Sequence, residues 1–486
     1  MPINPLLCAI LVLTAQFGVN NVKAQERLEV PALVDVRTEN SAGPGKVSSG
    51  RFRVYENRTE ASGKVIHLDF VVLHATNQNP EPDPFFVIAG GPGQAIVNAA
   101  RGWNDHWIRE SRDVVFINQR GTSGDNLLAF EMKTEGDTLQ QYLESLWEPE
   151  LVRTNLERLQ QDFDLTQYST CNAADDLNDF RLAMGYDKIN ISGASYGTRA
   201  SLVYIRRHGG SVRTAILHGC APIEFRNPLY HAPGAQRALD LIFDEVEANE
   251  PYRNAFGDLR SKFETILDRL EVEPAEAEVI HSGTGKTETV TLTRGTFASA
   301  VRFQMYYSGN SRRLPLLINA AYDGDYRPFA TSALQQNIGL RQSIAMGMLL
   351  CVTSAEDVAR ITPDEIESVT AGSFVGSSRV HSQMAAAGIW PRSELPENYG
   401  EPVCSDVQTL IFSGTIDPVT PPQWGDLVHG NFPNSLHVVV PAAHDIGGPC
   451  VDLIKRQFLT AGTVENLNTS CVDGMQLAPL ELPPGT

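Results

Sequence analysis

A serine flanked by glycines lies where a short apolar segment meets a helical one. The segment GASYG, residues 193–197, follows the apolar residues 189–192 and precedes an amphipathic stretch over residues 198–208. Glycines on both sides allow a sharp turn between a strand and a helix, and such a turn lifts the serine hydroxyl above the end of a sheet. We predict that Ser195 is a nucleophile that attacks a carbonyl carbon. The alternative is an ordinary glycine-rich turn without chemistry.

A nucleophilic serine needs a general base, and the base needs a carboxylate that orients it. Asp417 follows the apolar residues 407–412, and His444 follows the apolar residues 436–440. Each therefore lies just beyond the carboxyl end of a predicted strand. Because the carboxyl ends of parallel strands meet at one edge of a sheet, we predict that Ser195, His444 and Asp417 form a catalytic triad.

Other residues offer the same functional groups in less suitable places. Two histidines lie within a predicted strand or helix, where they are poorer bases, and two further acids lie near the predicted triad. These alternatives are His437 and His429 for the base, and Asp445 and Asp426 for the acid.

A glycine loop follows the early apolar residues 85–89, with the sequence GGPG at residues 90–93. Acyl transfer to serine needs two N–H donors for the oxyanion of the tetrahedral intermediate. We predict that the backbone N–H groups of Tyr196 and Gly91 form this oxyanion hole. A nucleotide-binding turn is the alternative, but the loop lacks the Lys and Ser/Thr of a P-loop, and no GxGxxG occurs.

The predicted elements must bring these loops together. Strand-like segments alternate with helical ones up to about residue 223, and the alternation returns after residue 403, which indicates an α/β fold with a mostly parallel sheet flanked by helices. Residues 224–403 are mainly helical, with helices expected over 234–249 and 252–270 and a hairpin over 278–292. We predict a core made of residues 25–223 and 404–486, into which residues 224–403 are inserted as a large helical lid.

Composition excludes several functions. The 486 residues carry a formal net charge of −19 without a basic cluster, which disfavours nucleic-acid binding. The only long apolar run is at residues 5–19, followed by a small-x-small pattern at 22–24. We interpret residues 1–24 as a signal peptide, and we expect a secreted or periplasmic protein without a membrane span. A buried N-terminal helix is the alternative.

Six of the seven cysteines lie beyond residue 24, and an oxidising compartment favours disulfides among them. Spacing alone does not choose among their 15 connectivities. The six are Cys171, Cys220, Cys351, Cys404, Cys450 and Cys471. No CxxC or HExxH motif occurs, so we expect neither a zinc site nor any other cofactor.

Five segments resemble the α/β-hydrolase peptidases of the proline iminopeptidase and tripeptidyl aminopeptidase-like group. They lie between about residues 65 and 471 and read AGGPGQ, INQRGTSGDN, DDLNDFRLAMGYDKINISGASYGTR, SGTIDPVTPPQWGD and VVPAAHDIGGPC. The resemblance implies the α/β-hydrolase fold and an exported serine exopeptidase that removes residues from the N-termini of small peptides. Ser195, Asp417 and His444 each occupy a matching motif position.

The resemblance also implies a group that recognises the free substrate amine. Glu356 and Asp357, in the segment CVTSAED, are similar to the acidic lid motif of these relatives, and a carboxylate in a partly dry pocket is the most direct partner for an ammonium. We predict that Glu356 is the amine anchor, with Asp357 beside it. The alternative is a helix N-cap cluster that starts at Ser354.

The chain departs from the group's pattern in two places. Asn118 stands where the group usually has Asp, so a carboxylate that organises the loop is missing. The lid lacks the cysteine that commonly precedes its Trp-Pro, which leaves Cys404 as a candidate partner of Cys351. Cys450 and Cys471 match the group's C-terminal cysteines and are therefore implied to form a disulfide.

Three other functions are alternatives to the predicted aminopeptidase activity. An esterase or lipase would use the same triad on carboxylic esters. A binding protein on a retired hydrolase scaffold would keep the fold without the reaction. Dehalogenases and epoxide hydrolases use an aspartate nucleophile, which does not fit Ser195.

Overall fold

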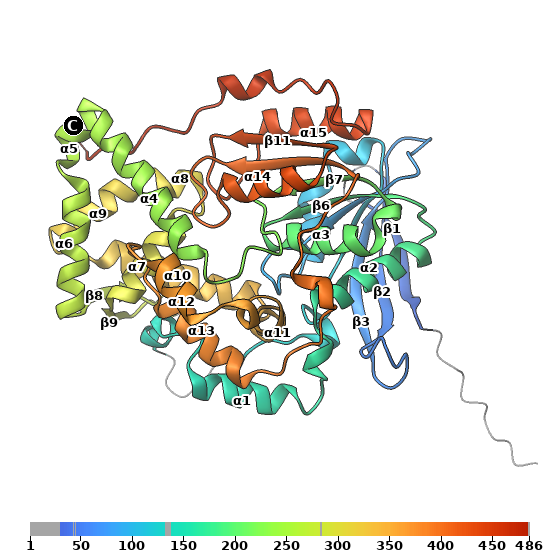
Figure 1. The fold of residues 1–486 in the computed structure, drawn as a ribbon, viewed down its shortest axis with the longest axis horizontal. Helices are drawn as coiled ribbons and strands as arrows, with labels where there is room; N and C mark the ends of the chain where they lie inside the picture. The colour runs from blue at the N-terminus through green and yellow to red at the C-terminus, as the bar shows by residue number, and fades with distance from the viewer. Residues whose placement is uncertain (1–29, 42, 44, 132–137, 282–283, 485–486) are drawn as a thin grey trace, which may run out of the picture.

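The computed structural model describes residues 30–41, 43, 45–131, 138–281 and 284–484. Its centre is a nine-stranded sheet with the order β1-β2-β3-β5-β4-β6-β7-β10-β11 (Figure 1). The bounds of these strands are β1 Ala32–Asn40, β2 Lys46–Tyr55, β3 Val65–Leu73, β4 Phe85–Ile88, β5 Val114–Ile117, β6 Ile189–Ala194, β7 Val212–His218, β10 Gln408–Gly414 and β11 Ser435–Val440.

Six strands of this sheet are parallel to one another, namely β5, β4, β6, β7, β10 and β11. At the other end of the sheet, β1, β2 and β3 pair antiparallel. Strands β4 to β7 are nearly continuous apolar runs, as expected for parallel strands covered on both faces. The parallel register brings the carboxyl ends of β4, β6, β7, β10 and β11 to one edge, and every predicted triad residue follows one of these strands.

Helices cover the sheet and make up most of the inserted segment (Figure 1). Those that pack on the sheet domain are α1 Pro149–Leu159, α2 Thr170–Ala183, α3 Tyr196–His208, α11 Met346–Glu356, α13 Ser378–Ile389, α14 Pro422–Asn431 and α15 Pro449–Ala461. The remaining helices are α4 His231–Ala248, α5 Glu250–Phe256, α6 Leu259–Val272, α7 Arg294–Gln304, α8 Ser308–Ser311, α9 Leu314–Tyr322, α10 Arg327–Ser343 and α12 Pro363–Thr370.

The inserted segment divides between two hydrophobic cores. Helices α4 to α10 form a core of their own around Phe263, Phe297 and Phe329, and the hairpin of β8 (Ala275–Ile280) and β9 (Thr287–Leu292) closes it. Helix α11 is buried along its whole length and instead joins the core under the sheet. The lid-like unit with its own core is thus shorter than the inserted segment.

Two local features differ from the sequence expectation. The helix expected over 252–270 is two helices, because Gly257 adopts φ +64°, a left-handed conformation that ends α5. Strands β1 and β2 were not predicted individually: β1 is the exposed edge of the sheet, and β2, which lies between β1 and β3, mixes buried residues with polar exposed ones. The hairpin over 278–292 is confirmed by the antiparallel pairing of β8 with β9.

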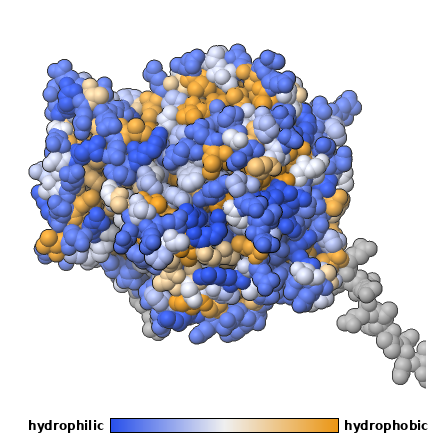
Figure 2. Space-filling model, viewed as in Figure 1, coloured by the Kyte–Doolittle hydropathy of each residue, from blue (hydrophilic) through white to orange (hydrophobic). Residues whose placement is uncertain are grey.

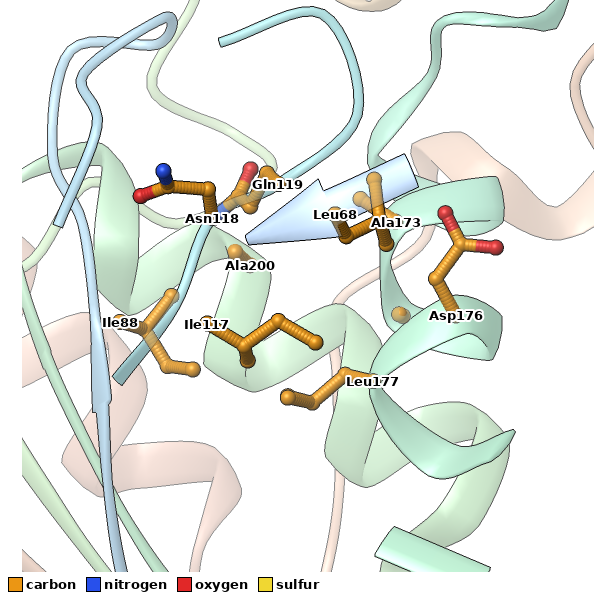
Figure 3. A pocket seen from close by; sticks show the side chains of 10 residues that line it. Leu68, Ile88, Ile117, Asn118, Gln119, Ala173, Asp176, Leu177 and Ala200 are labelled. Carbon is orange, nitrogen blue, oxygen red and sulfur yellow. The ribbon is translucent and has the colours of Figure 1, made fainter. Parts of the chain in front are cut away.

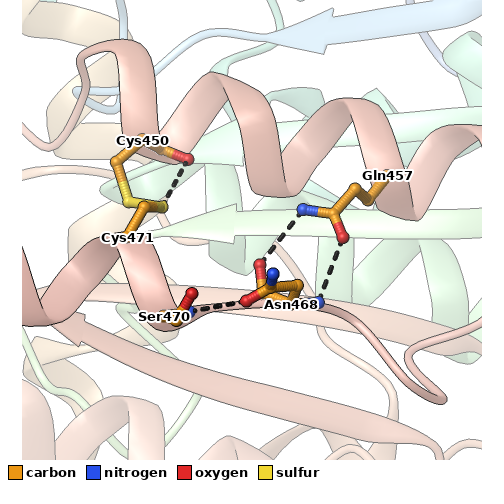
Figure 4. The surroundings of a disulfide bond; sticks show 5 residues. All are labelled: Cys450, Gln457, Asn468, Ser470 and Cys471. Atoms are coloured by element: carbon orange, nitrogen blue, oxygen red, sulfur yellow. Dashed lines mark hydrogen bonds between the residues drawn. A yellow bond between two sulfur atoms is a disulfide. The ribbon is translucent and has the colours of Figure 1, made fainter.

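The C-terminal segment links the sheet domain to the insert. A disulfide joins Cys450, in α15, to Cys471, and Gln457 exchanges two hydrogen bonds with the backbone of Asn468 beside it (Figure 4). From there the chain runs back across the molecule towards α5 (Figure 1). Leu480 is buried in the core of the insert, and its N–H donates to the Tyr252 hydroxyl.

The disulfide bears out the pairing of Cys450 with Cys471 that the resemblance implied. The candidate pairing of Cys351 with Cys404 is wrong. Cys351 is buried beside the indole N–H of Trp390, whereas Cys404 is exposed, and neither forms a disulfide.

Hydrophilic side chains cover most of the face seen in Figure 2, with smaller hydrophobic patches between them. Over the described ranges, no helix is both long enough and apolar enough to cross a membrane. The predicted signal peptide, residues 1–24, lies outside the described residues.

Candidate active site

Ser195 lies on a sharp turn between β6 and α3. Its φ of 56° and ψ of −126° are rare for a residue with a side chain, and holding such a conformation costs on the order of 1–3 kcal/mol. A Cβ on Gly193 would lie 2.2 Å from the carbonyl oxygen of Gly197, and one on Gly197 would lie 2.6 Å from that of Ile88. The two flanking glycines are therefore required by close backbone approach, as in a nucleophile elbow.

Asp417 and His444 form an oriented acid–base pair. Asp417 is fully buried, and its Oδ2 lies 2.7 Å from Nδ1 of His444. The N–H groups of Val419 and Thr420 donate to Oδ1, and the Thr420 hydroxyl donates to Oδ2. This bonding assigns the imidazole proton to Nδ1 and leaves Nε2 as the acceptor that a general base requires.

Burial acts to raise the pKa of the Asp417 carboxyl. The facing His444 and the backbone N–H groups of Thr420 and Val419 outweigh burial and hold this pKa below its ordinary value of 3.8. Asp417 is therefore a carboxylate at neutral pH.

A short backbone segment after β7 lies against both Ser195 and His444. The N–H of Ser195 donates to the carbonyl oxygen of His218 at 2.9 Å. A Cβ on the next residue, Gly219, would lie 3.2 Å from Cε1 of His444, and its φ of +59° also favours glycine. The backbone at 218–219 thus brings the loops that carry the serine and the histidine to the same end of the sheet.

The glycine loop lies beside the elbow. A Cβ on Gly90 would lie 3.3 Å from the Ala194 carbonyl oxygen and 3.7 Å from Cβ of Ser195. Gly91 has a φ of +111°, which suits glycine alone. Tyr196 opens α3, and the first N–H groups of a helix have no intrahelical acceptor. The N–H groups of Gly91 and Tyr196 are therefore suitably placed in the chain to serve as oxyanion donors.

Asn118 orders the segment that follows the glycine loop. Its Oδ1 accepts from the N–H groups of Ile96 and Val97, at 2.7 and 3.0 Å, just beyond the glycine loop. Its Nδ2 donates to the Ser123 hydroxyl at 2.8 Å. The Asn118 amide thus fixes the backbone at residues 96 and 97 without adding a negative charge near the oxyanion donors.

Residues of the inserted segment form hydrogen bonds with the loop that carries His444. The N–H of His444 donates to the Tyr306 carbonyl oxygen, and the Ala443 N–H donates to the Ser308 hydroxyl at 2.9 Å. The same Ser308 hydroxyl donates to Asp445 at 2.5 Å, and the Ser308 N–H donates to that carboxylate at 3.0 Å. Sequence reasoning missed these partners because they lie more than 130 residues from the histidine.

The alternative acids and bases have other partners. His437 lies 2.9 Å from the Asp426 carboxylate and 2.9 Å from the Ser413 hydroxyl, so it forms a second acid–imidazole pair on β11. Asp445 accepts from Ser308, and His429 contacts Ser435. The acid that contacts His444 is Asp417.

Glu356 is fully buried at the end of α11. Its Oε1 accepts from the Thr170 N–H, and its Oε2 accepts from the Thr170 and Tyr399 hydroxyls. Burial raises its pKa, although the nearby Arg199 acts to lower it. The Thr170 hydroxyl also lies 2.8 Å from that of Tyr196, so Glu356 is linked to the elbow by hydrogen bonds.

Asp357 is buried too, and it forms an ion pair of 2.6 Å with Arg199 of α3. The N-cap alternative for this segment is wrong, because α11 ends at Glu356 and Ser354 lies within its last turn. Both carboxylates thus bond to groups of the sheet domain, and an amine would reach Glu356 only by displacing the Tyr399 or Thr170 hydroxyl.

A small cavity lies between the sheet and helices α2 and α3, apart from the predicted triad (Figure 3). Mostly apolar side chains line it, including Leu68, Ile88 and Leu177, with the amides of Asn118 and Gln119 at one end. No residue of the predicted triad lines this cavity. Among the described residues, no group of three or more His, Cys, Asp and Glu side chains is arranged to hold a metal ion.

Two family models match the chain. Residues 83–263 match the alpha/beta hydrolase fold, and residues 372–471 match the TAP-like protein family. The chain has the α/β-hydrolase fold. The matched segments enclose the elbow, the glycine loop, and the loops of Asp417 and His444, and they support the serine peptidase group of this fold.

A curated relative of this α/β hydrolase is the serine protease Hip1 of Mycobacterium tuberculosis. It is 21% identical over 485 residues, which cover 88% of each chain. Among solved structures, a proline iminopeptidase from Mycobacterium smegmatis aligns with 13% identity and a TM-score of 0.38, covering 81% of this chain and 92% of that one. An esterase from Exiguobacterium antarcticum aligns with 14% identity and a TM-score of 0.34, covering 81% and 93%.

Proposed function

We propose that this serine hydrolase is an aminopeptidase that releases residues from the N-termini of small peptides through an acyl-enzyme. The observation that carries the proposal is the strained Ser195 at the end of β6, together with the buried Asp417 that contacts His444 on loops at the same edge of the sheet. The TAP-like match over residues 372–471 and the serine protease relative support a peptidase.

Each residue of the proposed site has one role in the reaction. Nε2 of His444 takes the proton from Ser195 as its Oγ attacks the substrate carbonyl, and Asp417 stabilises the imidazolium that forms. The N–H groups of Gly91 and Tyr196 donate to the oxyanion. His444 then returns the proton to the leaving amine, and water hydrolyses the acyl-enzyme by the same route. Every proton in this sequence is carried by a group of the protein or by water.

Recognition of the free N-terminus requires an acidic group that can bind the substrate amine. Glu356 and Asp357 remain the proposed anchors, since they are acidic and belong to the inserted segment. The present contacts of Glu356 with Thr170 and Tyr399 require that a substrate amine displace a hydroxyl group. A positively charged amine would gain a stronger, charge-assisted hydrogen bond than the neutral hydroxyl gives.

We further propose that the protein is exported. The disulfide between Cys450 and Cys471 supports this location, because structural disulfides persist mainly in oxidising compartments. The apolar residues 5–19 and the cleavage-like pattern after them support a secreted or periplasmic destination.

The deciding experiment uses paired chromogenic substrates. Pro-, Ala-, Ala-Ala- and Ala-Ala-Pro-p-nitroanilides are each offered with a free and with an acetylated N-terminus. We expect hydrolysis of the free forms only, abolished in Ser195→Ala. Equal rates on free and acetylated forms, or activity on a butyrate ester alone, would assign the chain to the esterases.

A further inference from the structure

Two arginines near the proposed base act on one another through their charges, and neither forms an ion pair with any described residue. Arg302, on α7, is 1% exposed, and its Nε and Nη1 have no hydrogen-bond partner in the described part of the chain. Arg379, on α13, is half-buried, and its buried Nε also lacks a partner there. His231, at the start of α4, adds an unpartnered Nδ1. Three helices thus bring unsatisfied donors together.

Two other arginines that are as deeply buried, Arg109 and Arg120, have partners for their guanidinium groups. Arg109, also 1% exposed, donates to the backbone carbonyls of His74, Asn104 and Lys46. Arg120 forms a bidentate pair with Asp176. A guanidinium buried without an acid is unfavourable, and within the described ranges Arg302 contacts only the Tyr306 hydroxyl and the rings of Phe303 and Tyr306, so an anionic partner from outside the chain would stabilise it.

Arg302 is connected to the imidazole of the proposed base through Tyr306. Nη2 of Arg302 donates to the Tyr306 hydroxyl at 2.7 Å, and the Tyr306 ring meets the His444 imidazole edge to face, with centroids 5.5 Å apart. The leaving amine must receive its proton from His444, so the leaving part of a substrate lies beside this imidazole. If the leaving part is a single residue, the carbon of its α-carboxylate is two bonds from the leaving nitrogen.

We infer that Arg302 and Arg379 form a subsite for a carboxylate on the leaving part of the substrate. This inference rests on the proposed function and narrows it to short peptides whose leaving residue carries a free carboxylate. The guanidinium groups would bind the carboxylate by charge-assisted hydrogen bonds.

The charges of the cluster favour an anion. Burial, followed by the charge of Arg302, lowers the pKa of Arg379 to about 10. Burial lowers the pKa of His231 well below its ordinary value, and Arg302, Arg379 and His444 add to this effect. At neutral pH His231 is therefore uncharged, and the positive charge of the cluster belongs to the two arginines.

The test compares Ala-Ala with Ala-Ala-amide, which differ only in the carboxylate. We expect kcat/KM of the wild type to be at least about tenfold higher on the free acid, as a charge-assisted contact would give. In Arg302→Met and in the less buried Arg379→Met the ratio of the two rates falls to about one, and in Arg379→Lys it is partly restored. Arg313→Met, which alters an exposed arginine paired with Glu481, is the matched control that keeps the ratio.

Labelling of Ser195 by a fluorophosphonate shows that each variant is folded. Ala-Asp-amide then assigns the carboxylate: faster cleavage than Ala-Ala-amide indicates a side-chain acid, and equally slow cleavage indicates the main-chain carboxylate. A wild-type ratio near one, or a ratio retained in both methionine variants, overturns the inference. Failure of the proposed function is distinguishable, because the wild type would then cleave acetyl-Ala-Ala as fast as Ala-Ala, or would cleave neither of them.

Discussion

The backbone N–H of His444 donates to the carbonyl oxygen of Tyr306, 3.1 Å away, although the two residues belong to different parts of the molecule. His444 follows β11 of the sheet, whereas Tyr306 lies between α7 and α8 of the insert. The adjacent Ser308 hydroxyl accepts from Ala443 and donates to Asp445. The insert therefore does more than cover the site, because it fixes the backbone that carries the proposed base.

Ser308→Ala removes the hydroxyl that bonds on both sides of His444. We expect kcat to fall by about tenfold with little change in KM, because the imidazole loses part of its positioning while substrate contacts remain. Steady-state kinetics on a free-amine peptide substrate measure both constants. Ser382→Ala is the matched control, since the Ser382 hydroxyl bonds only to its own helix at Ser378. A variant with wild-type kcat would show that the insert does not position the base.

Asp417→Asn keeps the shape of the side chain but removes its charge. We expect kcat to fall by about 10³–10⁴-fold, because an amide stabilises neither the correct tautomer nor the imidazolium. Single-turnover kinetics measure the loss in the acylation step. A fall of less than about tenfold would mean that Asp417 is not the orienting acid.

The same substitution has a predictable dependence on pH. The pKa of Asp417 is lower in the folded chain than its ordinary value of 3.8. A group whose pKa falls on folding stabilises the folded state above the unfolded-state pKa, and this contribution is lost as the pH falls through the folded-state pKa. The difference in unfolding free energy between wild type and Asp417→Asn should be constant from about pH 7 to 5 and shrink below about pH 4. Urea unfolding across this range measures it, and a difference that grows on acidification would contradict the assignment.

Asp357→Asn leaves the buried Arg199 without its ion-pair partner. We expect the free energy of unfolding to fall by about 3–5 kcal/mol, because an unpaired buried charge remains. Asp35→Asn breaks the exposed pair with Arg51 and should lower the free energy of unfolding far less, because water screens this pair. Guanidinium unfolding of both variants makes the comparison. Equal losses would show that the Arg199–Asp357 pair is not a structural contact.

Replacing both Cys450 and Cys471 by serine removes the covalent link at the base of the C-terminal segment. The disulfide closes a loop between positions 21 apart, and its loss should lower the free energy of unfolding by about 3 kcal/mol through loop-closure entropy. Cys404→Ser, which changes an exposed free thiol, is the control. Thermal unfolding with and without reductant checks the result: the wild type should respond to reductant and the double variant should not.

The sequence predicted the site residues where a reactive side chain lies in a local pattern that also predicts its backbone geometry. Glycines around Ser195 mark the elbow, and polar loops after apolar strands mark Asp417 and His444, because parallel strands bring their carboxyl ends to one edge. The break at Gly257 was missed because an isolated glycine within a helical pattern is usually tolerated. The division of the insert between two cores depends on packing that has no local signature.

The contacts of Tyr306, Ser308 and Arg302 were missed for a different reason. Each depends on bringing together segments far apart in the chain, and a single sequence carries no information on such pairs. For Asn118 the sequence indicated that a carboxylate that orders the loop is missing. The structure shows that the Asn118 amide itself orders the segment after the glycine loop.

The most direct test of the account is to map the residue that a fluorophosphonate modifies in the purified protein. Peptide mass spectrometry should find one phosphonyl group on Ser195, and His444→Ala should slow its formation strongly because the serine loses its base. Ser195→Ala should take up none and should not hydrolyse free-amine peptides. A label on another residue, or hydrolysis that persists in Ser195→Ala, would contradict the proposed triad.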